Sequence, residues 1–266
     1  MSERIDKILA HEGFGSRKDI KKLLRNYEVL LNGTRIFDSA TQIDPEKDTI
    51  IVDGEEINLH QNIYLMMNKI MHTVSSNKDG EHQTVFDLLD DDMKTPYLQD
   101  KLHIIGRLDM DTEGFLIFTT DGNLTHKLIS PKTHVGKTYF CILEHSETEE
   151  HKKQIEKQFF DGIHIAAEDN EPEADCQSGA IVKWLDDAAA SKYIQNSSWE
   201  GSANTYALLT IYEGKYHQVK RMFAAVDNKI VFLKRIAIGK TTLDPSLAPG
   251  EYRELSDEEI DNLMAE

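Results

Sequence analysis

The sequence has little of what secreted and membrane proteins use. Only two cysteines, Cys141 and Cys176, occur in 266 residues. A disulfide scaffold or a zinc cluster needs more cysteines at closer spacing, so both are expected to be reduced thiols. No apolar run approaches the roughly 18 residues of a membrane span, and the charged start from Met1 to Lys7 lacks the apolar stretch of a secretory signal. These absences predict a cytoplasmic protein without a membrane partner.

Positive charge is also scarce, because the formal net charge is -17. A polyanionic partner requires a local excess of Lys and Arg, so the distribution of charge matters more than its sum. Residues 1–35 contain eight cations: Arg4, Lys7, Arg17, Lys18, Lys21, Lys22, Arg25 and Arg35. Five acids accompany them, and seven cations against two acids form a second basic segment at residues 213–240. The acidic total therefore does not exclude an RNA partner.

The length predicts one large domain plus a small one. Helical spacing at Ile5, Ile8 and Leu9 is followed by a second helix at Arg17–Arg25, and short strands are expected at Val29–Leu31 and Thr49–Val52. These elements predict a separate unit at residues 1–60.

The first unit resembles a small RNA-binding domain first recognised in a small-subunit ribosomal protein. The features that carry the resemblance are its basic helix pair, the Ser16-Arg17 helix start and the strand and turn from Val29 to Gly33. The resemblance implies that the helices supply cations to structured RNA, and the candidates are Arg4, Lys7, Arg17, Lys18 and Lys21. A solvated, charged helix pair is the alternative reading.

Residues 61–266 have a mixed pattern that predicts one α+β domain with a largely antiparallel sheet. Strands are expected at Ile63–Met67, His103–Ile105, Phe115–Thr119, Lys137–Leu143 and Tyr206–Tyr212. Helices are expected at Leu124–Ile129, Glu150–Phe159, His217–Val226 and Asp257–Met264. The stretch from Glu168 to Asn204 is polar and predicts loops.

The segment Gly106–Gly114 contains three acids, an arginine and two glycines between two expected strands. A calcium loop fits its first six positions from Asp109, but Thr120 stands where a bidentate acid is needed. An aspartyl phosphotransferase would have Thr or Val in place of Glu113. A plain polar turn is the remaining simple interpretation.

The same segment resembles the catalytic signature of pseudouridine synthases that modify ribosomal RNA, especially the branch that acts on the small subunit. That signature is Gly-Arg-Leu-Asp-x-x-Thr-Glu-Gly followed by apolar residues and Asp-Gly, as at residues 106–122. Further matches are Asn68-Lys69, Lys137 and Tyr139, residues 213–222, and residues 247–252. Ile70 and His72 differ from the proline and glycine of the family.

The resemblance implies that Asp109 is the essential carboxylate, with no cofactor and no metal. Lys220 or Arg221 is expected to pair with it, and the sequence leaves open which. Tyr139 is expected to stack on the flipped base, and Arg107 and Lys137 to contact RNA. The implied partner is ribosomal RNA or a small-subunit assembly intermediate, bound by a monomer. The rival classes are a non-catalytic assembly factor and a metal-dependent phosphohydrolase built on Asp109 and Asp111.

Overall fold

The computed structural model describes residues 3–12, 14–45, 47–57, 62–94, 96–201 and 205–265. The chain divides into two compact units, which are described separately. The first comprises residues 1–63 together with 89–103, and the second comprises residues 64–88 and 104–266. The boundary expected between residues 60 and 61 lies outside the described residues, and the assignment of separate roles to the two units stays a prediction.

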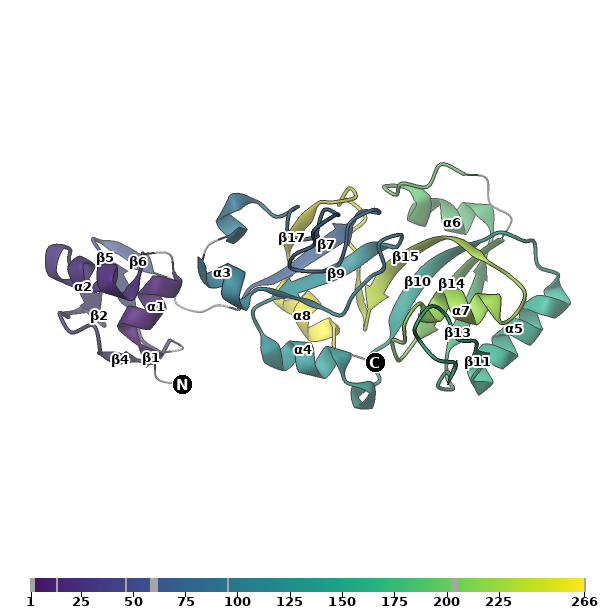
Figure 1. Cartoon of the computed structure of the whole chain (residues 1–266), viewed down its shortest axis with the longest axis horizontal. Helices are drawn as coiled ribbons and strands as arrows, with labels where there is room; N and C mark the ends of the chain where they lie inside the picture. The colour runs from purple at the N-terminus through teal and green to yellow at the C-terminus, as the bar shows by residue number, and fades with distance from the viewer. Residues whose placement is uncertain are drawn as a thin grey trace. The chain divides into compact units, whose positions relative to one another are not determined.

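Two helices pack on short strands in the N-terminal unit (Figure 1). The helices are α1 (Ile5–His11) and α2 (Arg17–Asn26), and α2 begins with a capping box between Ser16 and Asp19. A sheet of order β3-β2-β5-β6 is formed by Thr34–Arg35, Val29–Leu31, Ile50–Val52 and Glu55–Ile57, while β1 (Glu3–Arg4) pairs with β4 (Gln42–Ile43). Apolar side chains of both helices and of the strands form one core. The segment 89–103 of this unit contains η1 (Asp91–Lys94) and α3 (Pro96–Lys101).

The second unit is built on a sheet that has, among the described residues, nine strands (Figure 1). Its main order is β13 (Ile181–Leu185), β14 (Thr205–Ile211), β10 (Lys137–Leu143), β15 (Ile230–Ile238), β9 (Glu113–Thr119), β7 (Tyr64–Lys69) and β17 (Tyr252–Glu254). β8 (His103–Ile105) pairs with β9, and β16 (Thr241–Thr242) pairs with β15. The β15–β9 pair is parallel, whereas the other pairs along the main order are antiparallel. The predicted α+β class with a mixed, largely antiparallel sheet is confirmed.

Helices cover this sheet because its strands are apolar enough to be buried; all seven residues of β9 are buried. Helices α4 (Gly122–Ile129) and α8 (Asp257–Asn262) pack with Phe115 and Ile117 of β9 in one core. Helix α6 (Asp187–Ile194) packs with Phe140 of β10 and Phe232 of β15 in a second core. Helix α5 (Glu149–Asp161) meets α7 (Gln218–Ala224) through the edge-to-face pair Phe159–Phe223. The short elements η2 (Pro131–Thr133), β11 (His164–Ile165) and β12 (Ala174–Asp175) complete the unit.

Two expectations from the sequence were wrong or incomplete. The stretch from Glu168 to Asn204, whose end lies outside the described residues, contains β12, β13 and α6 rather than loops alone. Strand β13 lies at the edge of the sheet, and its short run of four apolar residues and one lysine was overlooked within a polar stretch. Strand β15 was not predicted, because Lys234 and Arg235 interrupt its apolar pattern although both are buried. Within the described part of the chain, no helix has the length and apolar character required to cross a membrane.

Candidate active site

The loop that joins β8 to β9 is placed beside the middle of β15. Glu113 and Gly114 at the start of β9 pair in parallel with Lys234 and Arg235. Gly114 has φ +104°, and a Cβ atom there would lie 2.2 Å from the carbonyl oxygen of Arg235. Only glycine fits this conformation and this close approach. Gly114 therefore brings the preceding loop, with Asp109, against the strand that carries Arg235.

A buried lysine holds the backbone of the loop between β8 and β9. The side chain of Lys69, at the end of β7, is fully buried. Its Nζ donates hydrogen bonds to the carbonyl oxygens of Asp109 and Thr112, both at 3.0 Å, and of Ile70 at 3.1 Å. Burial lowers the pKa of Lys69 to about 8, although the charge of Asp109 acts in the opposite direction. Lys69 thus fixes the backbone of the loop and does not reach into the cavity described below.

The chain that follows Lys69 also holds the loop, despite its differences from the family pattern. His72 adopts φ +64° where the family has glycine, and its backbone N–H donates to the carbonyl of Met110 at 2.8 Å. Histidine tolerates this left-handed conformation better than most residues. The hydroxyl of Ser75 donates to the carbonyl of Leu108 at 2.7 Å and accepts from its N–H. The contact between these two loops is therefore made without the glycine and the proline.

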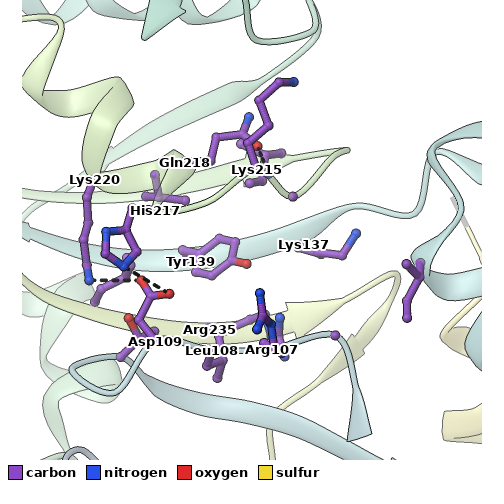
Figure 2. A pocket seen from close by; sticks show the side chains of 17 residues that line it. Arg107, Leu108, Asp109, Lys137, Tyr139, Lys215, His217, Gln218, Lys220 and Arg235 are labelled. Carbon is purple, nitrogen blue, oxygen red and sulfur yellow. Dashed lines mark hydrogen bonds and ion pairs between the residues drawn. The ribbon is translucent and has the colours of Figure 1, made fainter. Parts of the chain in front are cut away.

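The carboxylate of Asp109 faces two cationic or ionisable groups from the start of α7 (Figure 2). Lys220 Nζ lies 3.0 Å from Oδ2 of Asp109, and His217 Nε2 lies 3.7 Å from Oδ1. Lys220 also donates to Asp111. Burial acts to lower the pKa of Lys220, but the hydrogen bond to Asp111 and the charge of Asp109 outweigh it and raise that pKa above its usual value. Lys220 is therefore a cation that binds the carboxylates of both Asp109 and Asp111.

Arg221, the other cation that the sequence offered as a partner of Asp109, is used differently. Its side chain is buried, and its guanidinium donates to backbone carbonyls of Ala166, Pro172 and Tyr216. The bonds to Ala166 and Pro172 attach to α7 both segments that flank the turn at residues 168–171. Of the two adjacent cations, Lys220 contacts Asp109 and Arg221 anchors backbone.

A cavity of about 180 Å³ opens beside Asp109. Tyr139 on β10 is 8% exposed and forms part of its wall, next to Arg235, its cross-strand neighbour on β15. Lys137 and Arg107 also line it, and Figure 2 shows these cations on the far side of Tyr139 from Lys220. Burial, and then the charge of Arg235, lowers the pKa of Lys137. The cavity thus has a carboxylate at one end, an aromatic ring in its wall and cations around its rim.

The cations singled out in the N-terminal unit fall into two groups. Arg4 donates two hydrogen bonds to the buried Asp6, and Lys7 pairs with Glu3. Arg17, Lys18 and Lys21 are exposed on α2. Arg4 thus stabilises its own unit, and the three α2 cations are open to a partner.

Three residues of this arrangement were missed or undervalued in the sequence. Arg235 reaches the cavity only because β15 pairs with β10 and β9, which no local pattern indicates. His217 was expected as the first residue of a helix, and its approach to Asp109 depends on its own left-handed backbone at φ +46°. Lys69 was left without a role, although its position after an apolar strand beside a polar asparagine was a usable signal.

Comparison with known proteins agrees with this geometry. Residues 63–225 match the family model described as RNA pseudouridylate synthase, and residues 3–50 match that of the S4 domain. The chain belongs to the RNA pseudouridylate synthase family, whose members are isomerases that act on RNA, and the resemblance seen in the sequence is confirmed.

Full-length relatives support the same assignment. The chain is 41% identical over 258 residues to the uncharacterized RNA pseudouridine synthase YtzG of Bacillus subtilis (strain 168), covering 97% of this chain and 96% of that one. It is 37% identical over 265 residues to the ribosomal small subunit pseudouridine synthase A of Yersinia pestis, covering 98% of each. A solved structure described as a pseudouridylate synthase superposes with a TM-score of 0.60 at 35% identity, over 98% of this chain and 99% of that one.

Proposed function

We propose that this protein isomerises one uridine of small-subunit ribosomal RNA to pseudouridine, with Asp109 as the reacting carboxylate and without a cofactor. The observation that carries the proposal is the carboxylate of Asp109 beside the cavity, 3.0 Å from Lys220 and on the loop that bears the family signature. The named relative from Yersinia pestis supports the substrate class. The cytoplasmic location and the monomeric state stay predictions.

Each residue of the site has its own role in the proposed reaction. Enzymes that act on a base take it out of the stack, and Arg107, exposed at the rim, is suited to fill the gap left by the uridine. The base enters the cavity beside Tyr139. Asp109 attacks in its ionised form, for which Lys220 supplies the counter-charge. The bond from the sugar to N1 of uracil breaks, the base turns, and a bond from the sugar to C5 forms. The bond that the Asp109 carboxylate made breaks again, C5 loses its proton, and N1 takes one up.

Release of the C5 proton gives a direct test. Small-subunit ribosomal RNA transcribed with uridine tritiated at C5 should release tritium with the purified protein in the presence of a chelator, and large-subunit ribosomal RNA should release none. Release from both RNAs would remove the assignment to the small subunit. Loss of all release with the chelator would favour a metal-dependent reaction.

Tyr139 allows a prediction that separates its ring from its hydroxyl. Tyr139→Phe should keep base stacking and lose hydroxyl-dependent proton transfer, with a fall in kcat of about 10²-fold. Tyr139→Leu should be slower still, because the aromatic face is lost as well. Tritium release from small-subunit RNA measures both, with thermal unfolding as the control because the side chain is buried. Near-normal turnover of both variants would show that Tyr139 acts only as a core residue.

The exposed cations of α2 are expected to contribute affinity and not chemistry. Replacing Lys18 and Lys21 together with glutamine should weaken RNA binding and reduce the slope of log Kd against log salt by roughly 1.4 to 1.8, since each phosphate contact contributes about 0.7 to 0.9. The rate at saturating RNA should be unchanged. Lys47→Gln, an exposed cation of the same unit outside the helix pair, is the matched control. An unchanged salt slope in the double variant would contradict the role given to α2.

A further inference from the structure

A second, larger cleft adjoins the cavity beside Asp109. Its volume is about 1300 Å³, and it shares Arg107, Asp109, Lys215 and His217 with the smaller cavity. Small-molecule sites commonly have volumes of roughly 300 to 1,000 Å³, so this cleft has room for more than one base. An RNA that places its target uridine beside Asp109 therefore has space for a neighbouring nucleotide in this cleft.

Tyr216 is the tyrosine that lines the larger cleft. It is 37% exposed, yet its position is fixed from three sides. Its ring stacks on the imidazole of His217 with centroids 3.8 Å apart and planes 20° apart. Its hydroxyl donates to Asp169 Oδ2 at 2.8 Å, and its carbonyl accepts from Arg221 Nη1 at 3.0 Å.

The partners of Tyr216 are themselves fixed. Glu168 and Glu171 exchange backbone hydrogen bonds around a turn in which Asp169 has φ +53°. Glu168 hydrogen-bonds to His217 Nδ1 at 3.1 Å. The adjacent acids Glu168 and Asp169 therefore hold the two stacked rings, His217 and Tyr216. The buried guanidinium of Arg221 ties both arms of this turn to α7. An exposed aromatic ring that is already ordered loses little conformational entropy when a ligand stacks on it.

The charge around the ring indicates which part of a nucleotide meets it. Glu168 and Asp169 place negative charge at Tyr216, which disfavours a phosphate there. Arg107 also lines this cleft, but the proposed function assigns it to the gap left by the uridine. The uncharged π-face of a base is the part of a nucleotide that fits against the ring, and base–aromatic stacking accepts any of the four bases.

We propose that Tyr216 is the stacking platform for the base adjacent to the target uridine, so that the enzyme holds two neighbouring bases, one beside Tyr139 and one on Tyr216. This proposal rests on the proposed function, because it needs an RNA whose target uridine reaches Asp109. It assigns to Tyr216 a binding role and leaves bond making and breaking to the Asp109 cavity.

The test uses short RNAs that contain the mapped target uridine and carry 2-aminopurine on its 5′ or 3′ side. Asp109→Asn protein binds them without converting them. Quenching of the 2-aminopurine is expected at one of the two positions. Adding Tyr216→Leu should remove most of that quenching and raise Kd by roughly 5- to 150-fold, the range that corresponds to loss of one base–aromatic stack. Tyr216→Phe should keep the quenching.

Phe160→Leu is the matched control, because Phe160 is an exposed aromatic residue on α5 that lines neither cavity. It should leave both Kd and quenching unchanged. Unchanged quenching with Tyr216→Leu would overturn the proposal, as would equal losses with Phe and Leu, which would assign the effect to the hydroxyl's hold on Asp169. Failure of the proposed function would be recognised separately, as absence of tritium release by the wild-type protein.

Discussion

Asp109→Asn is expected to lower the rate of pseudouridine formation by at least about 10⁴-fold, as removal of a reacting nucleophile does in other enzymes. The amide keeps the size of the side chain and can still accept the hydrogen bond from Lys220. Folding and RNA binding should therefore be largely retained. Tritium release from small-subunit RNA gives the rate, and a filter-binding titration gives the affinity.

Asp111→Asn is the matched control for this substitution, because it changes a neighbouring acid that also contacts Lys220. Its side chain is 63% exposed, and its effect should be much milder. A metal site built on both acids would instead make the two substitutions similar and would tie activity to a divalent ion. Substantial tritium release by Asp109→Asn would remove the basis for the mechanism.

Lys220→Met is expected to have the second largest effect. It keeps the length and the apolar stem of the side chain but removes the charge that faces Asp109. Without that charge, the Asp109 carboxylate loses the contact that holds it in position. We expect kcat to fall by about 10²-fold or more, because a displacement of about 1 Å of a reacting group lowers the rate by that factor. Lys220→Arg should restore part of the rate, since it returns the positive charge.

Stability should change little in Lys220→Met. The Lys220 and Asp109 side chains are 21% and 31% exposed, so solvent screens the pair and the free energy of unfolding should change by no more than about 1 kcal/mol. Lys229→Met, which removes an exposed cation of the same basic segment, should leave kcat unaffected. Equal losses in Lys220→Met and Lys229→Met would assign Lys220 to general RNA attraction.

The elements predicted from the sequence are those whose signals are local. Strands β8 and β10 have the expected bounds, and helix α8 begins at Asp257 as expected. Strand β15 was missed because its buried cations depend on neighbours that are distant in the sequence. Lys234 donates to the carbonyl of Asn196 and Arg235 to that of Phe115, and neither contact leaves a local pattern.

The residues of the candidate site also differ in whether a local sequence signal identifies them. The family signature pointed to Asp109, and charge alone required a cation near it. The choice between Lys220 and Arg221 depends on the rotation of α7, because adjacent helical residues point about 100° apart. That rotation follows from the left-handed backbone of His217 and from the carbonyls that Arg221 finds at Ala166 and Pro172. The sequence could therefore name the pair of candidates and not the member that contacts Asp109.

The central claim is tested most directly by mapping pseudouridine in ribosomal RNA from cells that lack this protein and carry either the wild-type chain or Asp109→Asn. The wild-type chain should produce pseudouridine at one position of the small-subunit RNA, and that position should stay uridine with Asp109→Asn. An identical pseudouridine map in cells with the wild-type chain, with Asp109→Asn and with neither would contradict the account.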